Sequence, residues 1–193
     1  NIFYSNTDTE VILNAYKKWG VRSFDKFNGM WSFAILDKEK KEIILSRDRY
    51  GVKPLYYHCS KDKIIFSSEI KGIYSSNAKI ELDKDKLIYS DKILEGAFTT
   101  RYKDVDILPP GSFFKINLKN LEINRVRWWK GINSIPDINL NYSKAIEKTK
   151  ELLYSATRIR LVSDVKISTS LSGGIDSSTI FAILNNIENN KIV

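Results

Sequence analysis

The residues with the clearest chemical potential lie in one heptad, residues 172–178, with the sequence Ser-Gly-Gly-Ile-Asp-Ser-Ser. An apolar-leaning run at 165–171 precedes it and another apolar run at 179–184 follows, so the pattern predicts a strand, a tight turn and a helix. The glycines permit positive φ, and the acid and hydroxyls favour a helix start. Such a turn points backbone N–H groups and the positive end of the helix dipole at one place. We therefore expect this turn to bind a phosphate.

The heptad differs from a Walker A loop, because no Gly-Lys-Ser/Thr follows the glycines and no lysine is placed to reach a β- or γ-phosphate. A plain capped turn would explain any one of its features, but not so many hydrogen-bonding groups in seven residues. The heptad resembles the SGGxDS pyrophosphate loop of the ATP pyrophosphatase family. Members of that family adenylate a carboxylate or a similar oxygen and release pyrophosphate.

Composition limits the class of protein that carries this loop. The 193 residues contain no apolar run of about eighteen and do not begin with the pattern of a signal peptide. Cys59 is the single cysteine, which excludes an internal disulfide and fits a reducing cytoplasm. The net charge is +8, but the lysines are scattered among acids. We therefore expect a cytoplasmic protein that binds neither a membrane nor nucleic acid.

The hydrophobic pattern before the heptad predicts, first, a helix over 8–20 that is capped by Thr7 or Asp8 and ended by Gly20. A second short helix is predicted over 23–27. Four antiparallel strands in meander order should follow, at 30–36, 42–45, 55–58 and 64–67. Because these strands are almost continuously apolar, we expect the sheet to be covered on both faces.

The middle of the chain is predicted to be less regular. Residues 82–94 read as a weak helix, 107–116 as a turn and a strand, and 121–129 as its hairpin partner. Residues 133–141 read as a linker. Ser143 is then expected to cap a helix, with Glu147 in an approximate capping box, and this helix leads into the strand before the heptad.

Three segments, residues 27–34, 45–57 and 66–71, resemble the class II glutamine amidotransferase domain. That domain followed by a pyrophosphate loop is the arrangement of the glutamine-hydrolysing asparagine synthetase family, and the whole chain resembles an internal piece of that family. Within 45–57, Arg47 and Asp48 can pair or bind loop carbonyls, so we interpret them as scaffold and not as catalytic residues.

The resemblance implies an α+β part followed by an α/β part. The first would be a partial Ntn-type αββα sandwich of antiparallel sheets, and the second the start of a PP-loop doubly wound parallel sheet. We expect the amidotransferase domain at 1–120, a linker at 121–141 and the start of the synthetase domain at 142–193. A doubly wound sheet needs several parallel strands, so we expect both domains to be truncated.

The resemblance also assigns roles to individual residues. Asp8 matches the family aspartate that receives the α-amino group of glutamine. Asp176 would hold Mg²⁺, directly or through water. The groups that would bind ATP and hold the leaving pyrophosphate are the backbone of Ser170 and Leu171, which lie where the family contacts AMP, and Ser172, Gly173, Gly174, Asp176, Ser177 and Ser178.

The family's nucleophile, an amino-terminal cysteine, has no counterpart, because the sequence begins with Asn1. His58 lies in a predicted strand and Cys59 at the end of it, well inside the chain, where packing roles are expected. We therefore assign no catalytic residue and expect the chain as given not to hydrolyse glutamine.

For the intact protein, the resemblance implies a glutamine-dependent amide ligase in asparagine biosynthesis. It would convert aspartate to asparagine through an aspartyl-adenylate, with ammonia from glutamine, using ATP and Mg²⁺. Its partners would be ATP, aspartate and glutamine, and the family allows a homodimer. Two alternatives stay open: Ser168-Thr169-Ser170 replaces smaller or apolar residues of the family, which leaves the acceptor carboxylate open, and the missing nucleophile with the half-built nucleotide domain permits a role without catalysis. One is a related ligase acting on another carboxylate, such as a uronic acid or a lactam-forming β-amino acid, and the other is a non-catalytic interaction fragment.

Overall fold

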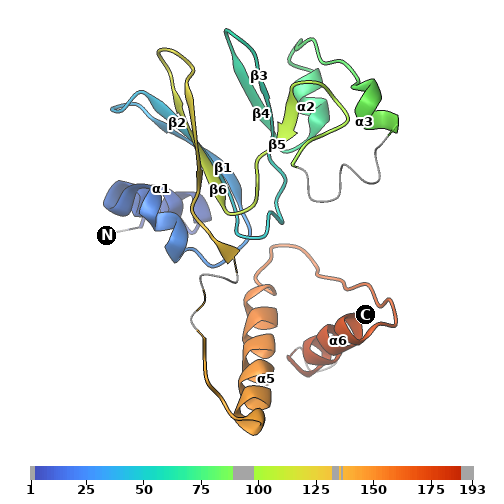
Figure 1. Ribbon diagram of the computed structural model, residues 1–193. Coiled ribbons are helices and arrows are strands. Elements are labelled where there is room, and N and C mark those ends of the chain that lie inside the picture. The colour runs from blue at the N-terminus through green and yellow to red at the C-terminus, as the bar shows by residue number, and fades with distance from the viewer. Residues whose placement is uncertain (1–2, 89–97, 132–134, 136, 188–193) are drawn as a thin grey trace. The chain divides into compact units, whose positions relative to one another are not determined.

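The computed structural model describes residues 3–88, 98–131, 135 and 137–187 (Figure 1). It divides into two compact units, Asn1–Ile135 and Pro136–Val193. In the part of the chain that the structure describes, no helix combines the length and the apolar character needed to cross a bilayer.

The first unit contains two antiparallel sheets and several helices. One sheet has the strand order β1-β2-β6-β7, and the other has the order β4-β3-β5. The strands are β1 (Ser32–Asp37), β2 (Glu42–Arg47), β3 (Tyr56–Cys59), β4 (Ile64–Ser67), β5 (Val105–Ile107), β6 (Ser112–Asn117) and β7 (Ile123–Arg127). The helices are α1 (Asp8–Trp19), the 3₁₀ helix η1 (Gly20–Lys26), α2 (Ile70–Tyr74) and α3 (Lys84–Ile88). The expected mixture of helices with antiparallel sheets is therefore confirmed.

The predicted four-strand meander is wrong, because β2 pairs with β6 and not with β3. The hairpins β1–β2 and β3–β4 form as expected, but residues 48–55 carry the chain from one sheet to the other. The apolar strand β6 then returns to cover the open edge of β2, where Leu45 lies opposite Phe114. Hairpin signals are local, so they did not reveal a pairing between strands so distant in sequence.

Three hydrophobic clusters set the order of the layers in this unit. Leu45 and Phe114 of one sheet pack against Tyr57 of the other sheet and against Leu55, which comes directly before β3. The outer face of the first sheet packs against α1 and η1, and the outer face of the second packs against α2, as Figure 1 shows. The order is helices, sheet, sheet, helix. The expected burial of both sheet faces is therefore confirmed, in two sheets where one was predicted.

The ends of α1 follow the sequence closely. Gly20 takes φ 59° and its N–H donates to the Tyr16 carbonyl, so it ends the helix as predicted. Thr7 is the N-cap, although its side chain makes no capping hydrogen bond. Of the weak helix predicted over 82–94, α3 covers 84–88, and the remainder from 89 lies outside the described residues. Strand β7 lies within the range 121–141 that was expected to be a linker.

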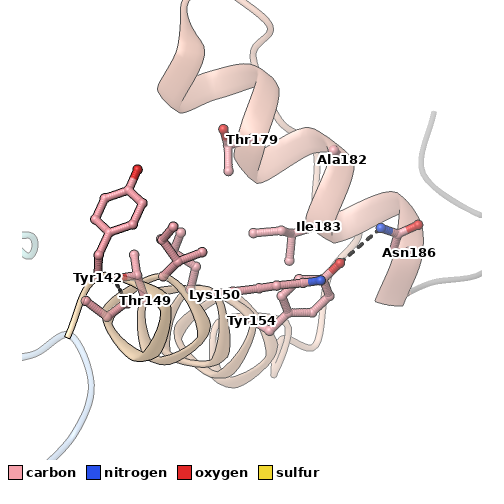
Figure 2. A pocket seen from close by; sticks show the side chains of 11 residues that line it. Tyr142, Thr149, Lys150, Tyr154, Thr179, Ala182, Ile183 and Asn186 are labelled. Atoms are coloured by element: carbon pink, nitrogen blue, oxygen red, sulfur yellow. Dashed lines mark hydrogen bonds between the residues drawn. The ribbon is translucent and has the colours of Figure 1, made fainter. Parts of the chain in front are cut away.

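The second unit contains α5 (Tyr142–Ile159) and α6 (Ile175–Ile187). Asn141 caps α5, with its Oδ1 accepting from the Lys144 amide at 3.0 Å, so the prediction of a Ser143 cap was wrong by two residues. An open apolar groove of about 550 Å³ runs between the two helices, and at one end Asn186 Nδ2 donates to the Tyr154 hydroxyl at 3.1 Å (Figure 2). No residue of the heptad lines this groove.

The strand predicted over 165–171 does not form. A strand needs a neighbour for its ladder, and residues 137–187, as described, contain no second extended segment paired with it. Val165 is accordingly 76% exposed and Leu171 is 57% exposed. The helix predicted after the heptad is confirmed as α6.

Candidate functional site

Asp8 is the first residue of α1, and its side chain is exposed. Capping bonds around this helix start come from Glu10, whose carboxylate accepts from the amides of Tyr4 at 2.9 Å and Ser5 at 2.7 Å. The hydrogen bond from the Ser5 hydroxyl, together with these amides, lowers the pKa of Glu10. Among the described residues, none donates a hydrogen bond to the Asp8 carboxylate. Asp8 therefore keeps both carboxylate oxygens available for a cationic ligand.

A cavity of about 350 Å³ adjoins Asp8. Val11 and Ile12 of α1 supply one apolar wall, and the segment 26–31 supplies the other. The ammonium of Lys26 lies 5.2 Å from the ring centre of Trp19, at the opposite end of α1 from Asp8. The cavity thus combines one free carboxylate with aliphatic and aromatic walls. This combination suits a small ligand with an ammonium group and an aliphatic chain.

Arg47 and Asp48 are scaffold residues, as predicted. The Asp48 carboxylate is buried and accepts from the amides of Tyr50, Val52 and Lys53, at 3.0–3.1 Å. Arg47 donates to the carbonyls of Lys53 at 2.7 Å and Leu108 at 2.8 Å. Burial lowers the pKa of Arg47, and the charge of Asp48 opposes this effect.

The heptad forms an exposed turn at the start of α6. Gly173 takes φ 82°, which a residue with a side chain adopts only with strain, and a Cβ built there would meet no atom within 4 Å. The hydroxyls of Ser172 and Ser177 lie 2.9 Å apart, and Ser177 also donates to the Gly174 carbonyl at 3.1 Å. Within the described residues, we find no acceptor for the amides of Ser172, Gly173 and Gly174. The turn is therefore open, with its donors available.

Asp176 lies in the first turn of α6 and is exposed. The described part of the chain contains no cluster of three or more acidic, histidine or cysteine side chains. Protein sites for Mg²⁺ often use one or two carboxylates together with substrate phosphates, so a single carboxylate beside an open turn with available backbone donors has the ligand chemistry that this ion uses. Ser170 and Leu171, which precede the turn, are exposed as well.

Cys59 and His58 have packing roles in the structure. Cys59 packs against the core between the two sheets, and burial raises the pKa of its thiol. His58 is buried, and its Nδ1 lies 2.9 Å from the Asp104 carbonyl. Neither residue lines the cavity beside Asp8.

The sequence did not reveal the second wall of this cavity. Asn28, Gly29 and Met30 read as a helix end and a strand start, and nothing in their pattern placed them near Asp8. The structure brings them to the cavity because η1 folds back along α1 and both pack on the same sheet. The structure describes Asp8 and the heptad in separate units.

Comparison with known proteins finds a different family match in each part of the chain. Residues 1–129 match the family model described as glutamine amidotransferase domain, and residues 148–192 match the model described as asparagine synthase. The chain is 40% identical over 187 residues to putative asparagine synthetase [glutamine-hydrolyzing] 2 of Methanocaldococcus jannaschii, covering 93% of this chain and 35% of that protein. It is 34% identical to asparagine synthetase [glutamine-hydrolyzing] 2 of Bacillus subtilis, covering 93% of this chain and 26% of that protein.

The chain therefore spans about a third or less of the length of these relatives. Among solved structures, glutamine phosphoribosylpyrophosphate amidotransferase from B. subtilis aligns with a TM-score of 0.45 and 19% identity, covering 96% of this chain and 39% of that one.

Proposed function

The chain belongs to the glutamine amidotransferase domain family, and we propose that it carries the glutamine site and the nucleotide turn of a glutamine-dependent amide ligase of the asparagine synthetase type. One observation carries this proposal. A glutamine amidotransferase match over 1–129 and an asparagine synthase match over 148–192 occur in a single chain, and the second match contains the open heptad turn. In this proposal, a glutamine-binding part is joined to a part suited to activating a carboxylate.

The proposed glutamine site is the cavity beside Asp8. The free Asp8 carboxylate would accept the α-ammonium group in a charge-assisted hydrogen bond. Val11, Ile12 and Phe27 would contact the methylene groups of the ligand. The layer order of helices, sheet, sheet and helix supports assigning this unit to the Ntn type of αββα sandwich.

The proposed nucleotide site is the heptad turn. The hydroxyls of Ser172, Ser177 and Ser178 and the backbone of the glycines would hold the pyrophosphate that leaves when a substrate carboxylate attacks the α-phosphate of ATP. Asp176 would hold Mg²⁺, which neutralises phosphate charge when bound. Ser170 and Leu171 would contact the AMP portion, and the turn would belong to a PP-loop α/β sheet. We place this chemistry in the cytoplasm, with aspartate as the carboxylate acceptor.

The test of the activity uses the complete gene product. With ATP, Mg²⁺ and glutamine present, aspartate should stimulate pyrophosphate release and asparagine should accumulate in the same proportion. Pyrophosphate release that responds to a uronic acid or a β-amino acid, and not to aspartate, would refute the asparagine assignment. It would leave the amide-ligase class standing.

The test of the nucleotide turn uses the 193-residue chain. Titration calorimetry with Mg-ATP should show a dissociation constant that rises at least about tenfold in Asp176→Ala, the effect of losing one charge-assisted interaction. Asp164→Ala is the matched control, because Asp164 is also exposed but lies before the turn. Equal effects of the two substitutions would refute the role of Asp176.

A further inference from the structure

Arg49 does not line the cavity beside Asp8, yet it bonds to the segment that does. Its Nη1 donates to the Phe27 carbonyl, and its Nη2 donates to the Asp25 carbonyl at 2.7 Å. These two bonds join residues that are 22 and 24 positions apart in sequence. The guanidinium therefore fixes the backbone where η1 ends and the cavity wall begins.

The same guanidinium is part of a closed cycle of side-chain contacts. It lies over the Trp128 ring, with 5.3 Å from Cζ to the ring centre. Trp128 stacks on Trp31 with ring centres 5.9 Å apart, and Trp31 meets Phe27 edge to face at 5.5 Å. The hydrogen bond from Arg49 to the Phe27 carbonyl closes this cycle of contacts. Two of its members, Phe27 and Trp31, line the cavity.

The neighbouring residue Asp48 fixes the other end of the same wall. Its amide donates to the Trp31 carbonyl at 3.0 Å, and its carboxylate accepts from the Trp31 amide at 3.3 Å. Between these anchors, Asn28, Gly29 and Met30 are exposed, and we find no hydrogen bond from them to any other described residue. The shape of the wall therefore depends on its two ends.

We propose that Arg49 is a positioning residue of the amino-acid site, holding residues 27–31 at the distance from Asp8 that an α-amino acid such as glutamine requires. This proposal rests on the proposed glutamine site. The planar guanidinium can donate to two carbonyls and stack on an indole at the same time, whereas a lysine ammonium is a single point charge on a flexible stem. Charge alone would thus not replace Arg49.

The experiment is calorimetric titration of the 193-residue chain with L-glutamine, at least 20 °C below each variant's melting temperature. In Arg49→Lys the dissociation constant should rise about fivefold, the effect of one lost hydrogen bond, and in Arg49→Ala it should rise further. Arg125→Ala is the matched control, because Arg125 also lies over an aromatic ring, that of Phe114 at 5.4 Å, but does not contact the cavity wall. It should bind glutamine like the unaltered chain.

The outcomes separate the proposal from its premise. If Asp8→Asn weakens glutamine binding and Arg49→Lys lowers the melting temperature without changing the dissociation constant, Arg49 is only structural and the proposal is overturned. If Asp8→Asn has no effect, or the unaltered chain shows no binding at millimolar glutamine, the proposed glutamine site itself fails, and this proposal with it. Should Arg49→Ala not fold, the lysine variant alone decides the outcome.

Discussion

Replacing Asp48 with asparagine should strongly destabilise the first unit. The Asp48 side chain is 1% exposed, and each carboxylate oxygen accepts from two backbone amides. Oδ1 accepts from Tyr50 and Val52, both at 3.1 Å, and Oδ2 accepts from Lys53 at 3.0 Å and Trp31 at 3.3 Å. Asparagine has nearly the same shape but replaces one oxygen with an NH₂ group. Whichever way the amide turns, two backbone donors that bond to the buried carboxylate then face another donor.

The magnitude follows from those two donors. A hydrogen bond to a charged acceptor contributes about 1.5–3 kcal/mol net, and leaving a buried donor unpaired costs a similar amount. Two lost bonds should therefore reduce the free energy of unfolding by about 3–6 kcal/mol. Since domains are stable by only about 5–15 kcal/mol, this loss is a large part of the total.

The assay is urea unfolding followed by tryptophan fluorescence. The four tryptophans all lie in the first unit, so the signal reports on that unit alone: Trp19, Trp31, Trp128 and Trp129. The midpoint should fall by about 2 M with an unchanged slope. Asp62→Asn is the control, because Asp62 is exposed and accepts one bond, from the Ser60 hydroxyl at 2.9 Å. A loss below about 1 kcal/mol in Asp48→Asn would refute the reasoning.

Three further predictions concern the same unit. Gly51→Ala should lower the free energy of unfolding by more than about 2 kcal/mol, as measured by thermal unfolding. The reason is that Gly51 has φ 65° and an added Cβ would lie 2.8 Å from the guanidinium carbon of Arg47. A loss below about 0.5 kcal/mol would contradict this. The Lys40 side chain and amide lower the pKa of Asp37 to about 2, so Asp37 should add about 1 kcal/mol of stability above pH 4 that is lost as the pH falls towards 2. Urea midpoints of Asp37→Asn and the unaltered chain should thus differ at pH 7 and converge near pH 2, and a constant difference would oppose this. Burial raises the pKa of Cys59, so a disulfide reagent at pH 8 should react at least about tenfold faster in urea than with the folded chain, and equal rates would exclude a packed thiol.

Most single elements could be predicted because their signals are local. Gly20 ends α1 through its positive φ, and the polar residues 38–41 form the turn between β1 and β2. The assembly of the sheets could not be predicted in this way. β6 pairs with β2 because both strands are apolar on both faces and bury each other's edge, and no local signal records that preference. The strand predicted over 165–171 failed for the related reason that strand formation depends on a partner.

The residues of the candidate site also differ in how far the sequence could predict them. The heptad stood out because its residue types and spacing carry chemistry, whereas Asp8 was assigned through the family resemblance. The wall formed by 26–31 did not, because its role comes from position and not from residue type. No sequence pattern identified Arg49 either, since its partners are backbone carbonyls, which every residue has.

Asp48 and Arg49 are adjacent in the connection between β2 and β3, and they have different structural roles there. Asp48 turns inward and satisfies the amides of the turn it begins, so its replacement should change stability. Arg49 turns towards η1 and holds the cavity wall, so its replacement by lysine should change affinity more than stability. Both residues reach the segment 27–31, at opposite ends. The connection that carries the chain from one sheet to the other is therefore also the part of the fold that determines the shape of the cavity.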